Sequence, residues 1–243
     1  MQAFSGTDLH RRCDCRCTEQ RRREFTANVS HELKTPLQSI SGYSELLKCG
    51  MAKPEDTAPF AGRIYSEAQR LIALVEDIIN LSHLDAGNGY EWGEVDLLDA
   101  ARRVADSRAA LAEENGIRLT VAGSPVTVKG IPELVSDILC SLCDNAIKYN
   151  RPNGSVEVTV TQDAAAAILT VKDTGIGIPE ADLDRIFERF YRVDKSRSKE
   201  VGGTGLGLSI VKHAAMLMNA KIDVDSTASE GTTITVTFQE VAP

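Results

Sequence analysis

Several features that would assign this chain to a special class are missing. None of its windows approaches the 18 or more uncharged apolar residues of a membrane-spanning helix, and residues 1–23 lack the apolar core of a signal peptide. Positive charge is scarce, because 27 Lys and Arg against 35 Asp and Glu give a net charge of −8, the wrong sign for general binding to a nucleic-acid backbone. With 18 Gly and 8 Pro in 243 residues, collagen, low-complexity tracts and wholesale disorder are excluded as well. We therefore expect a folded, cytoplasmic chain without a nucleic-acid partner, which meets a membrane only through segments absent from this sequence.

Cysteine spacing also excludes two classes. The six cysteines form neither a disulfide framework nor a paired C-x-x-C zinc pattern; they are Cys13, Cys15, Cys17, Cys49, Cys140 and Cys143. We expect reduced thiols, and we interpret the first three as part of an incidental Arg-rich leader rather than as a soft-metal site.

The N-terminal third has a helical pattern. From about residue 18 to residue 86, apolar residues recur at three- and four-residue steps, and the interruption at residues 50–59 contains Pro54 and Pro59. This pattern predicts an antiparallel hairpin of two long helices. Because about 70 residues enclose too little core to stand alone, we expect two chains to form a four-helix bundle, that is, a homodimer. The predicted domains are a leader at 1–17, which we interpret as the remnant of a signalling linker, and a helical domain at 18–88.

The remainder mixes helices and short strands after a Gly-rich break at residues 87–93. Helices are predicted near 97–115, 131–149 and 205–218. Strands are predicted near 117–121, 126–129, 156–161, 164–171, 221–225 and 232–238. Since strands bunch together and alternate in polarity, the expected fold of residues 93–243 is an α+β sandwich with a mixed sheet and helices on one face.

A histidine stands out on the first helix. The apolar positions Val29 and Leu33 each lie two residues from His31, a rotation of roughly 200°, so the imidazole should face solvent. Thr35 shares its face one turn later, and the carboxylate of Glu32 can approach the ring. Glu32 could take the Nδ1 proton and leave Nε2 free to attack an electrophile. A lone surface His is usually just solvated, but the string from Phe25 to residue 37, FTANVSHELKTPL, resembles the phosphoacceptor box of sensor histidine kinases.

That resemblance implies that His31 is phosphorylated. It also implies that Glu32 to Thr35 forms an E-x-x-T phosphatase motif, in which the threonine orients a water that hydrolyses the phosphorylated partner.

Late in the helix at 131–149, three side chains share one face and suit a nucleotide. Asn145, Lys148 and Tyr149 lie at i, i+3 and i+4. An amide oxygen can ligate Mg²⁺, an ammonium can meet phosphate oxygens, and a phenol ring can lie against a base. Taken alone, this stretch is an ordinary amphipathic helix end.

Two glycine-containing segments follow. Asp173 comes after a strand and can accept an adenine amino proton, while Gly175 and Gly177 let the backbone approach a ligand. Residues 202–207 open the last helix, where unsatisfied N–H groups favour an anion; the candidate binding residues are Gly203, Thr204, Gly205, Leu206 and Gly207. A P-loop and a dinucleotide fingerprint are excluded by counting, since the required Lys and third Gly are missing.

Between them lies a basic segment with few apolar residues, which we interpret as a mobile loop that closes on phosphates. Its basic residues are Arg189, Arg192, Lys195, Arg197 and Lys199.

In order, these segments resemble the N, G1, F and G2 boxes of the histidine kinase catalytic domain, in the ATPase superfamily that includes gyrase, Hsp90 and MutL. The resemblance implies that Asn145 binds Mg²⁺, that Lys148 and Arg192 contact the phosphates of ATP, that Tyr149 and Asp173 hold adenine, and that the glycines shape a lid. One departure is Ser141, where many members carry a second Asn, and a shorter side chain there is expected to lower metal affinity or rate.

The resulting prediction is an ATP-dependent protein histidine kinase that autophosphorylates on His31 and passes the phosphoryl group to an aspartate of a response regulator receiver domain. Two alternatives stay open at this point: an ATPase of the same superfamily without phosphohistidine, and a degenerate nucleotide-binding dimer that works as a scaffold or mainly as a phosphatase.

Overall fold

The structure is a computed structural model that describes residues 6–87, 89–163, 166–193 and 203–239, with side chains from Phe25 onward. The chain divides into two compact units, Met1–Val75 and Glu76–Pro243. The predicted domain limits at 18–88 and 93–243 stay a prediction.

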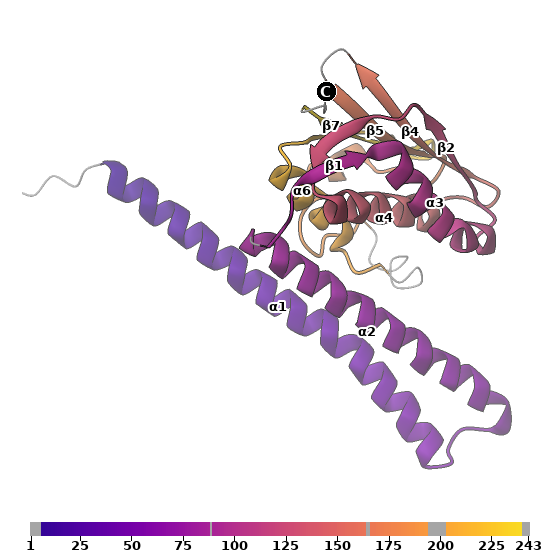
Figure 1. Ribbon diagram of the computed structural model, residues 1–243. Coiled ribbons are helices and arrows are strands. Elements are labelled where there is room, and N and C mark those ends of the chain that lie inside the picture. The colour runs from indigo at the N-terminus through magenta and orange to yellow at the C-terminus, as the bar shows by residue number, and fades with distance from the viewer. Residues whose placement is uncertain (1–5, 88, 164–165, 194–202, 240–243) are drawn as a thin grey trace, which may run out of the picture. The chain divides into compact units, whose positions relative to one another are not determined.

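The first unit contains the expected pair of helices. Helix α1 runs over Gly6–Lys48, the short 3₁₀ turn η1 over Pro54–Asp56, and α2 over Thr57–Ala86, so that α2 continues into the second unit (Figure 1). At the closed end, the rings of Tyr43 and Phe60 pack with their centroids 5.1 Å apart. The start of α1 at Gly6 shows that much of the expected leader is helical, earlier than the periodicity from residue 18 indicated.

Some apolar side chains of this unit are left exposed by the residues that the structure describes. Leu37 is 58% exposed and Ile72 is 51% exposed, and Val75 at the end of the unit is 42% exposed. Large aliphatic side chains at helical spacing are unlike the solvated face of a helix, which is polar. The pattern therefore leaves an apolar stripe that the described side chains do not cover.

The second unit is built on a mixed five-stranded sheet. Its spatial order is β2-β4-β5-β7-β6, where β2 is parallel to β4 and all other pairs are antiparallel. The strands are β2 Arg118–Gly123, β4 Ser155–Asp163, β5 Ala166–Asp173, β6 Lys221–Thr227 and β7 Gly231–Phe238. A separate two-stranded ladder joins β1 Gly93–Asp96 to β3 Thr127–Gly130.

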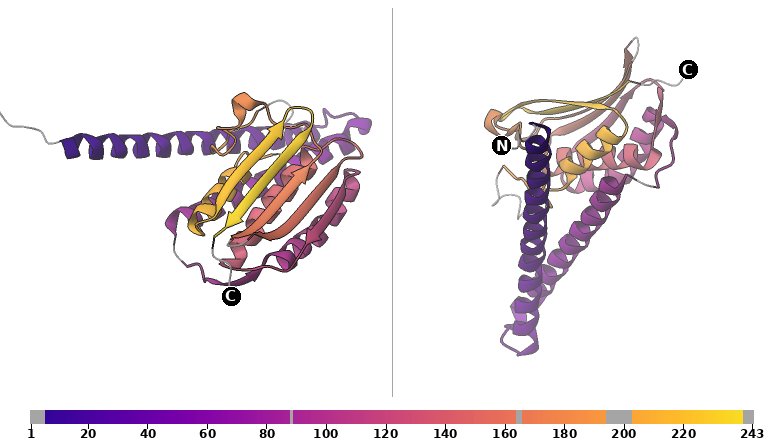
Figure 2. Two further views of the ribbon diagram at one scale, coloured as in Figure 1. Left: turned by 90° about the horizontal axis from the view of Figure 1, so that it is seen from above. Right: turned by 90° about the vertical axis from the view of Figure 1, so that its left-hand side faces the viewer.

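Three helices cover one face of this sheet, and the other face is open (Figure 2). They are α3 Leu97–Glu114, α4 Pro132–Lys148 and α6 Gly207–Leu217. The strands alternate accordingly: Val156, Val158 and Val160 of β4 are 0% exposed, while the residues between them face outward. The predicted α+β class and mixed sheet are confirmed.

The described helices include none that is both long and apolar enough to cross a membrane. Among the cysteines with described side chains, Cys49, Cys140 and Cys143 are free thiols. The side chains of Cys13, Cys15 and Cys17 lie outside the described part.

Candidate functional site

His31 lies on α1 with its side chain in solvent, as the sequence predicts. The side chain is 81% exposed, and its Nδ1 lies 3.9 Å from Oε1 of Glu32. At this distance a small rotation of either side chain brings the carboxylate within hydrogen-bond reach of the Nδ1 proton. The opposite ring nitrogen, Nε2, is then the atom presented to a reactant.

The carboxylate of Glu32 has a second neighbour that sequence reasoning missed. Arg70 on α2 places Nη2 3.5 Å from Oε2 of Glu32, and its Nη1 lies 4.0 Å from Glu67. The arginine side chain is only 13% exposed, so it is held between the two helices and gives Glu32 a fixed electrostatic partner. No local sequence signal marks Arg70, because it lies 38 residues away and only the packing of the hairpin brings it near.

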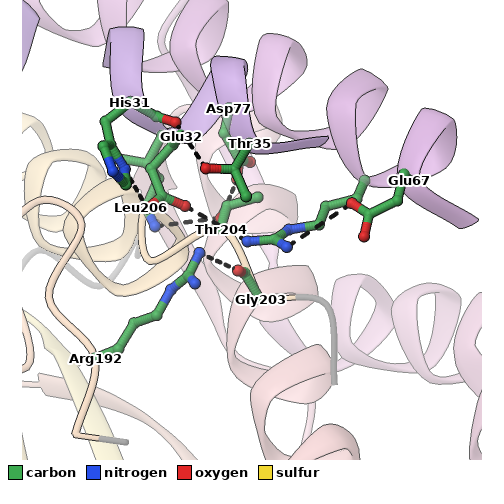
Figure 3. A network of polar contacts seen from close by, with 10 residues as sticks. His31, Glu32, Thr35, Glu67, Asp77, Arg192, Gly203, Thr204 and Leu206 are labelled. Atoms are coloured by element: carbon green, nitrogen blue, oxygen red, sulfur yellow. Dashed lines mark hydrogen bonds and ion pairs between the residues drawn. The ribbon is translucent and has the colours of Figure 1, made fainter. Parts of the chain in front are cut away.

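Thr35 lies one turn after His31 on the same helix. Its hydroxyl donates a hydrogen bond of 3.2 Å to the backbone carbonyl of His31 (Figure 3). Pro36 follows directly and lacks a backbone N–H, so the carbonyl of Glu32 receives no intrahelical bond from it. The threonine oxygen keeps its lone pairs for a water molecule on the exposed face.

In the second unit, the C-terminal end of α4 carries the predicted nucleotide-facing groups. Asn145, Lys148 and Tyr149 are all half-buried. Within the described residues, the side-chain amide of Asn145 and the ammonium of Lys148 make no hydrogen bond or ion pair with another residue. An amide oxygen and an ammonium that the fold brings together and leaves unengaged are suited to a metal ion and a phosphate.

Asp173 ends β5 with its two carboxylate oxygens in different environments. Oδ1 accepts hydrogen bonds from the backbone N–H groups of Gly175, at 2.7 Å, and Thr232, at 3.3 Å. Burial raises the pKa of this carboxyl above its ordinary value, although the two N–H groups oppose that shift. Among the described residues, no group donates to Oδ2, so this oxygen is available to an N–H donor of a ligand.

The glycines near Asp173 permit close backbone contacts. A Cβ on Gly175 would lie 2.4 Å from the carbonyl oxygen of Tyr149, and one on Gly177 would lie 2.0 Å from that of Thr227. Gly177 also has a φ of +67°, which favours glycine. Both positions therefore require glycine for packing of this loop, whatever its ligand.

The second glycine-rich segment lies against α4. A Cβ on Gly203 would come within 2.9 Å of the phenol oxygen of Tyr149, and one on Gly207 within 3.9 Å of Nδ2 of Asn145. Ser141, the departure noted in the sequence, is 3.7 Å from the same point on Gly207. The structure thus brings residues 203–207 and the end of α4 together. Helix α6 begins at Gly207, and no side chain caps its N-terminus.

The described arginines of the basic segment are held by other groups. Arg192 donates a hydrogen bond from Nη2 to the carbonyl of Gly203, and Arg189 donates one of 2.7 Å to Asp85 on α2. Lys195, Arg197, Lys199 and Gly202 lie outside the described residues.

Asp77 on α2 is a further contact that the sequence did not reveal. Its Oδ2 accepts a hydrogen bond of 2.6 Å from the hydroxyl of Thr204, and that hydroxyl accepts one of 3.2 Å from the N–H of Leu206 (Figure 3). Burial raises the pKa of Asp77, while Thr204 and the positive charge of Lys148 oppose the shift. The hydroxyl of Thr204, a residue predicted to contact the nucleotide, is therefore already hydrogen-bonded to a carboxylate.

The fold and these groups together define a class: a helical hairpin that carries an exposed histidine beside a carboxylate, followed in the chain by an α+β sandwich. Comparison with known proteins gives the family. Residues 21–87 match the His Kinase A (phospho-acceptor) domain, and residues 130–242 match the histidine kinase-, DNA gyrase B- and HSP90-like ATPase domain. The chain belongs to the sensor histidine kinases and comprises their catalytic core.

Sequence relatives agree. The chain is 36% identical over 234 residues to the sensor protein kinase WalK of Staphylococcus haemolyticus, with 95% of this chain and 38% of the relative covered. Identity is 37% to WalK of Staphylococcus saprophyticus with the same coverage, and 36% to a Staphylococcus aureus WalK of which 56% is covered. The chain therefore spans only about two-fifths to just over half of the length of these relatives.

Solved structures show the same architecture. Acinetobacter baumannii histidine kinase AdeS superposes with a TM-score of 0.70 at 22% identity, covering 86% of this chain and 98% of that one. Histidine kinase ThkA, solved in complex with the response regulator protein TrrA, gives 0.73 at 20% identity, covering 99% and 68%. Full-length ShkA in complex with AMPPNP gives 0.66 at 27% identity, covering 90% and 46%.

Proposed function

We propose that this chain transfers the γ-phosphoryl group of ATP to His31 and then to an aspartate in the receiver domain of a response regulator. The observation that carries the proposal is the state of His31: the side chain is 81% exposed, beside a carboxylate, in the segment that matches the phospho-acceptor family. An imidazole in this setting has a free nucleophilic nitrogen and a neighbouring proton acceptor.

In the first step, Nε2 of His31 attacks the γ-phosphorus, and the bond to the bridging oxygen breaks with its electron pair going to ADP. Glu32 lies where it can accept the Nδ1 proton, which keeps the imidazole nucleophilic. Arg70 holds the carboxylate of Glu32 beside the ring.

The nucleotide is assigned to the second unit. Asp173 accepts from the adenine amino group through Oδ2, Tyr149 lies against the base, and Lys148 meets phosphate oxygens. We assign Mg²⁺ to Asn145, because its amide is unengaged among the described residues and lies beside Gly207. When bound, the metal neutralises the charge that develops on the phosphates. Gly203, Thr204, Gly205, Leu206 and Gly207 supply backbone N–H groups to the phosphates, and Arg192 joins them after leaving the Gly203 carbonyl.

Thr35 supports a second activity, the hydrolysis of the phosphorylated regulator. Its hydroxyl donates to the carbonyl of His31 and can accept a hydrogen bond from water on the exposed face. A water oriented one turn from His31, with Glu32 nearby, has the position required for attack on a phosphoaspartate docked there.

The partners follow from the surface of the hairpin. Leu37, Ile72 and Val75 form an exposed apolar stripe, which a second copy of the chain would bury in a four-helix bundle. The complex of ThkA with its response regulator supports a receiver domain as the acceptor. We place the reaction in the cytoplasm, where both ATP and the receiver are available.

The test is incubation of the full chain with γ-labelled ATP and Mg²⁺. We expect acid-labile, base-stable label that His31→Gln removes and that His83→Gln, a change at another exposed histidine, retains. Transfer of this label to a receiver domain should follow on mixing. Label that persists in His31→Gln would overturn the assignment, and ATP hydrolysis without any covalent label would favour the ATPase alternative.

A further inference from the structure

The five-stranded sheet has an open edge at β2. The backbone N–H groups of Arg118 and Ser124 each donate a 3.1 Å hydrogen bond toward the β4 segment. Because backbone groups alternate in direction along a strand, those of Leu119 and Val121 point away from β4. In the described part of the chain, no strand pairs with that side of β2, which forms the rim of the sheet in Figure 2.

The other edge of the sheet is protected, and β2 is not. Strand β6 carries the ion pair of Lys221 and Asp223, 2.7 Å apart, and the further charge of Asp225. Charged residues, prolines and bulges are the usual means of preventing an edge strand from pairing. Strand β2 pairs with β4 in continuous register, lacks proline, and carries a single charge at its first residue, Arg118.

A hollow follows this edge. Helix α3 and β2 enclose a volume of about 630 Å³. Helix α3 contributes the alanines Ala105, Ala109 and Ala112 as well as charged residues to its lining, and β2 contributes Leu119 and Val121. Small side chains opposite an unpaired strand leave room for larger apolar side chains from an added strand.

The hollow is bordered by charges of both signs, and none of them forms an ion pair with another described residue. These are Arg102, Asp106, Glu113 and Arg118. By contrast, Arg103 on the next face of α3 is paired with Asp99 at 2.8 Å. The charges at the hollow are therefore available to a partner that carries both a basic and an acidic residue.

We propose that β2 and α3 form a docking site for an extended peptide segment of a partner protein. The segment pairs with the free edge of β2, places bulky apolar side chains at alternate positions in the hollow, and meets the bordering charges with opposite charges. This surface involves none of the residues assigned to nucleotide or phosphoryl transfer, so the proposal is independent of the proposed function.

The probe is the fluorescein-labelled peptide acetyl-KVTVTVE-amide, in which the valines alternate and each end carries a charge. Binding to the full chain is followed by fluorescence anisotropy, and hydrogen exchange reports the amides of Leu119 and Val121. We expect saturable binding, slower exchange at both amides, and at least about 10-fold weaker binding of a peptide with serine in place of the valines.

Two variants test the geometry. Ala109→Phe fills the hollow, and Val121→Pro removes an outward N–H at a position where an edge strand tolerates proline. Each should weaken binding at least about 10-fold, which is a loss of about 1.4 kcal/mol. The control Ala110→Phe, on an exposed position of α3 away from the hollow, should change affinity less than about twofold.

Autophosphorylation should stay within about twofold of the parent in all three variants, which shows that they fold. Absence of saturable binding, or binding that Ala109→Phe leaves unchanged, would overturn the proposal. Self-association of the chain that Val121→Pro abolishes would also overturn it, because the edge would then belong to a second copy.

Discussion

Replacing Asp173 by Asn tests the adenine pocket at a single atom. The backbone N–H groups of Gly175 and Thr232 both donate to Oδ1, so an asparagine should keep its oxygen there and present its NH₂ group where Oδ2 was. A donor would then face the amino group of adenine, itself a donor. Loss of a hydrogen bond to a charged acceptor amounts to about 1.5–3 kcal/mol, or about 10- to 150-fold in ATP affinity.

The assay is calorimetric titration with ATP and with inosine triphosphate, which carries oxygen in place of the amino group. The parent should prefer ATP, and Asp173→Asn should lose or reverse that preference without lowering the midpoint of thermal unfolding. An ATP affinity within about threefold of the parent, or an unchanged ratio between the two nucleotides, would refute the assignment of Oδ2 to adenine.

The same carboxyl gives a pH dependence with a definite sign. Burial raises the pKa of Asp173, so protonation of the folded protein begins at a higher pH than for an ordinary aspartate. The contribution of the Asp173 carboxyl to the stability of the fold is fully present below its pKa in the unfolded chain. This contribution is lost as the pH rises through its pKa in the folded protein. The affinity for ATP should instead fall as the pH drops through the pKa of Asp173 in the folded protein, because the protonated carboxyl is a poorer acceptor. The affinity for inosine triphosphate should not show this loss.

Three further substitutions have expected outcomes. Asp77→Asn keeps an oxygen that accepts from the hydroxyl of Thr204, but it removes the charge of a carboxyl whose pKa is raised by burial. At neutral pH the midpoint of thermal unfolding should therefore rise, and a lower midpoint would show that the charge is stabilising. Arg70→Gln removes the guanidinium that lies beside Glu32, and it should lower the rate of autophosphorylation about 3- to 10-fold with KM for ATP unchanged. Arg70→Lys should restore part of the rate, and a change in KM alone would contradict this reasoning. Gly205→Ala introduces a Cβ at a φ of +76° and only 3.0 Å from a backbone atom, so it should destabilise the protein by about 1–2 kcal/mol in denaturant unfolding. The control Gly42→Ala, which has open space around it, should be neutral or stabilising. Equal effects of the two substitutions would argue against backbone strain at Gly205.

The fold was accessible from sequence where burial follows a simple period. In β4, Val156, Val158 and Val160 alternate with polar residues, and the strand forms where that alternation predicts it. Strand β1 was missed, because four residues after a Gly-rich break carry too few positions to show a period. Its existence depends on pairing with β3, a contact more than thirty residues away.

The residues of the candidate site also fall into those that local sequence predicts and those that it does not. His31 was predictable because its exposure follows from the helical positions of its neighbours, and the glycines of residues 203–207 were predictable because they stand at the start of a helix. Arg70 and Asp77 were not, since each acts through a residue far away in the chain and neither occupies a recognisable motif. Polar partners that are distant in sequence can be identified only in the folded structure, whereas local periodicity and turn residues can be read from the sequence.

The acidic character of the chain bears on which form of the nucleotide it accepts. Burial raises the pKa of both Asp77 and Asp137. The negative charges of Glu76 and Asp144 also raise the pKa of Asp77, and the charge of Asp77 raises the pKa of Asp137. Lys148 opposes this for Asp77, but it is a single cation. A free triphosphate would bring up to four more negative charges toward this region, whereas a triphosphate that carries Mg²⁺ brings about two fewer. We therefore expect electrostatics, together with the amide ligand proposed at Asn145, to favour the metal complex of ATP over free ATP.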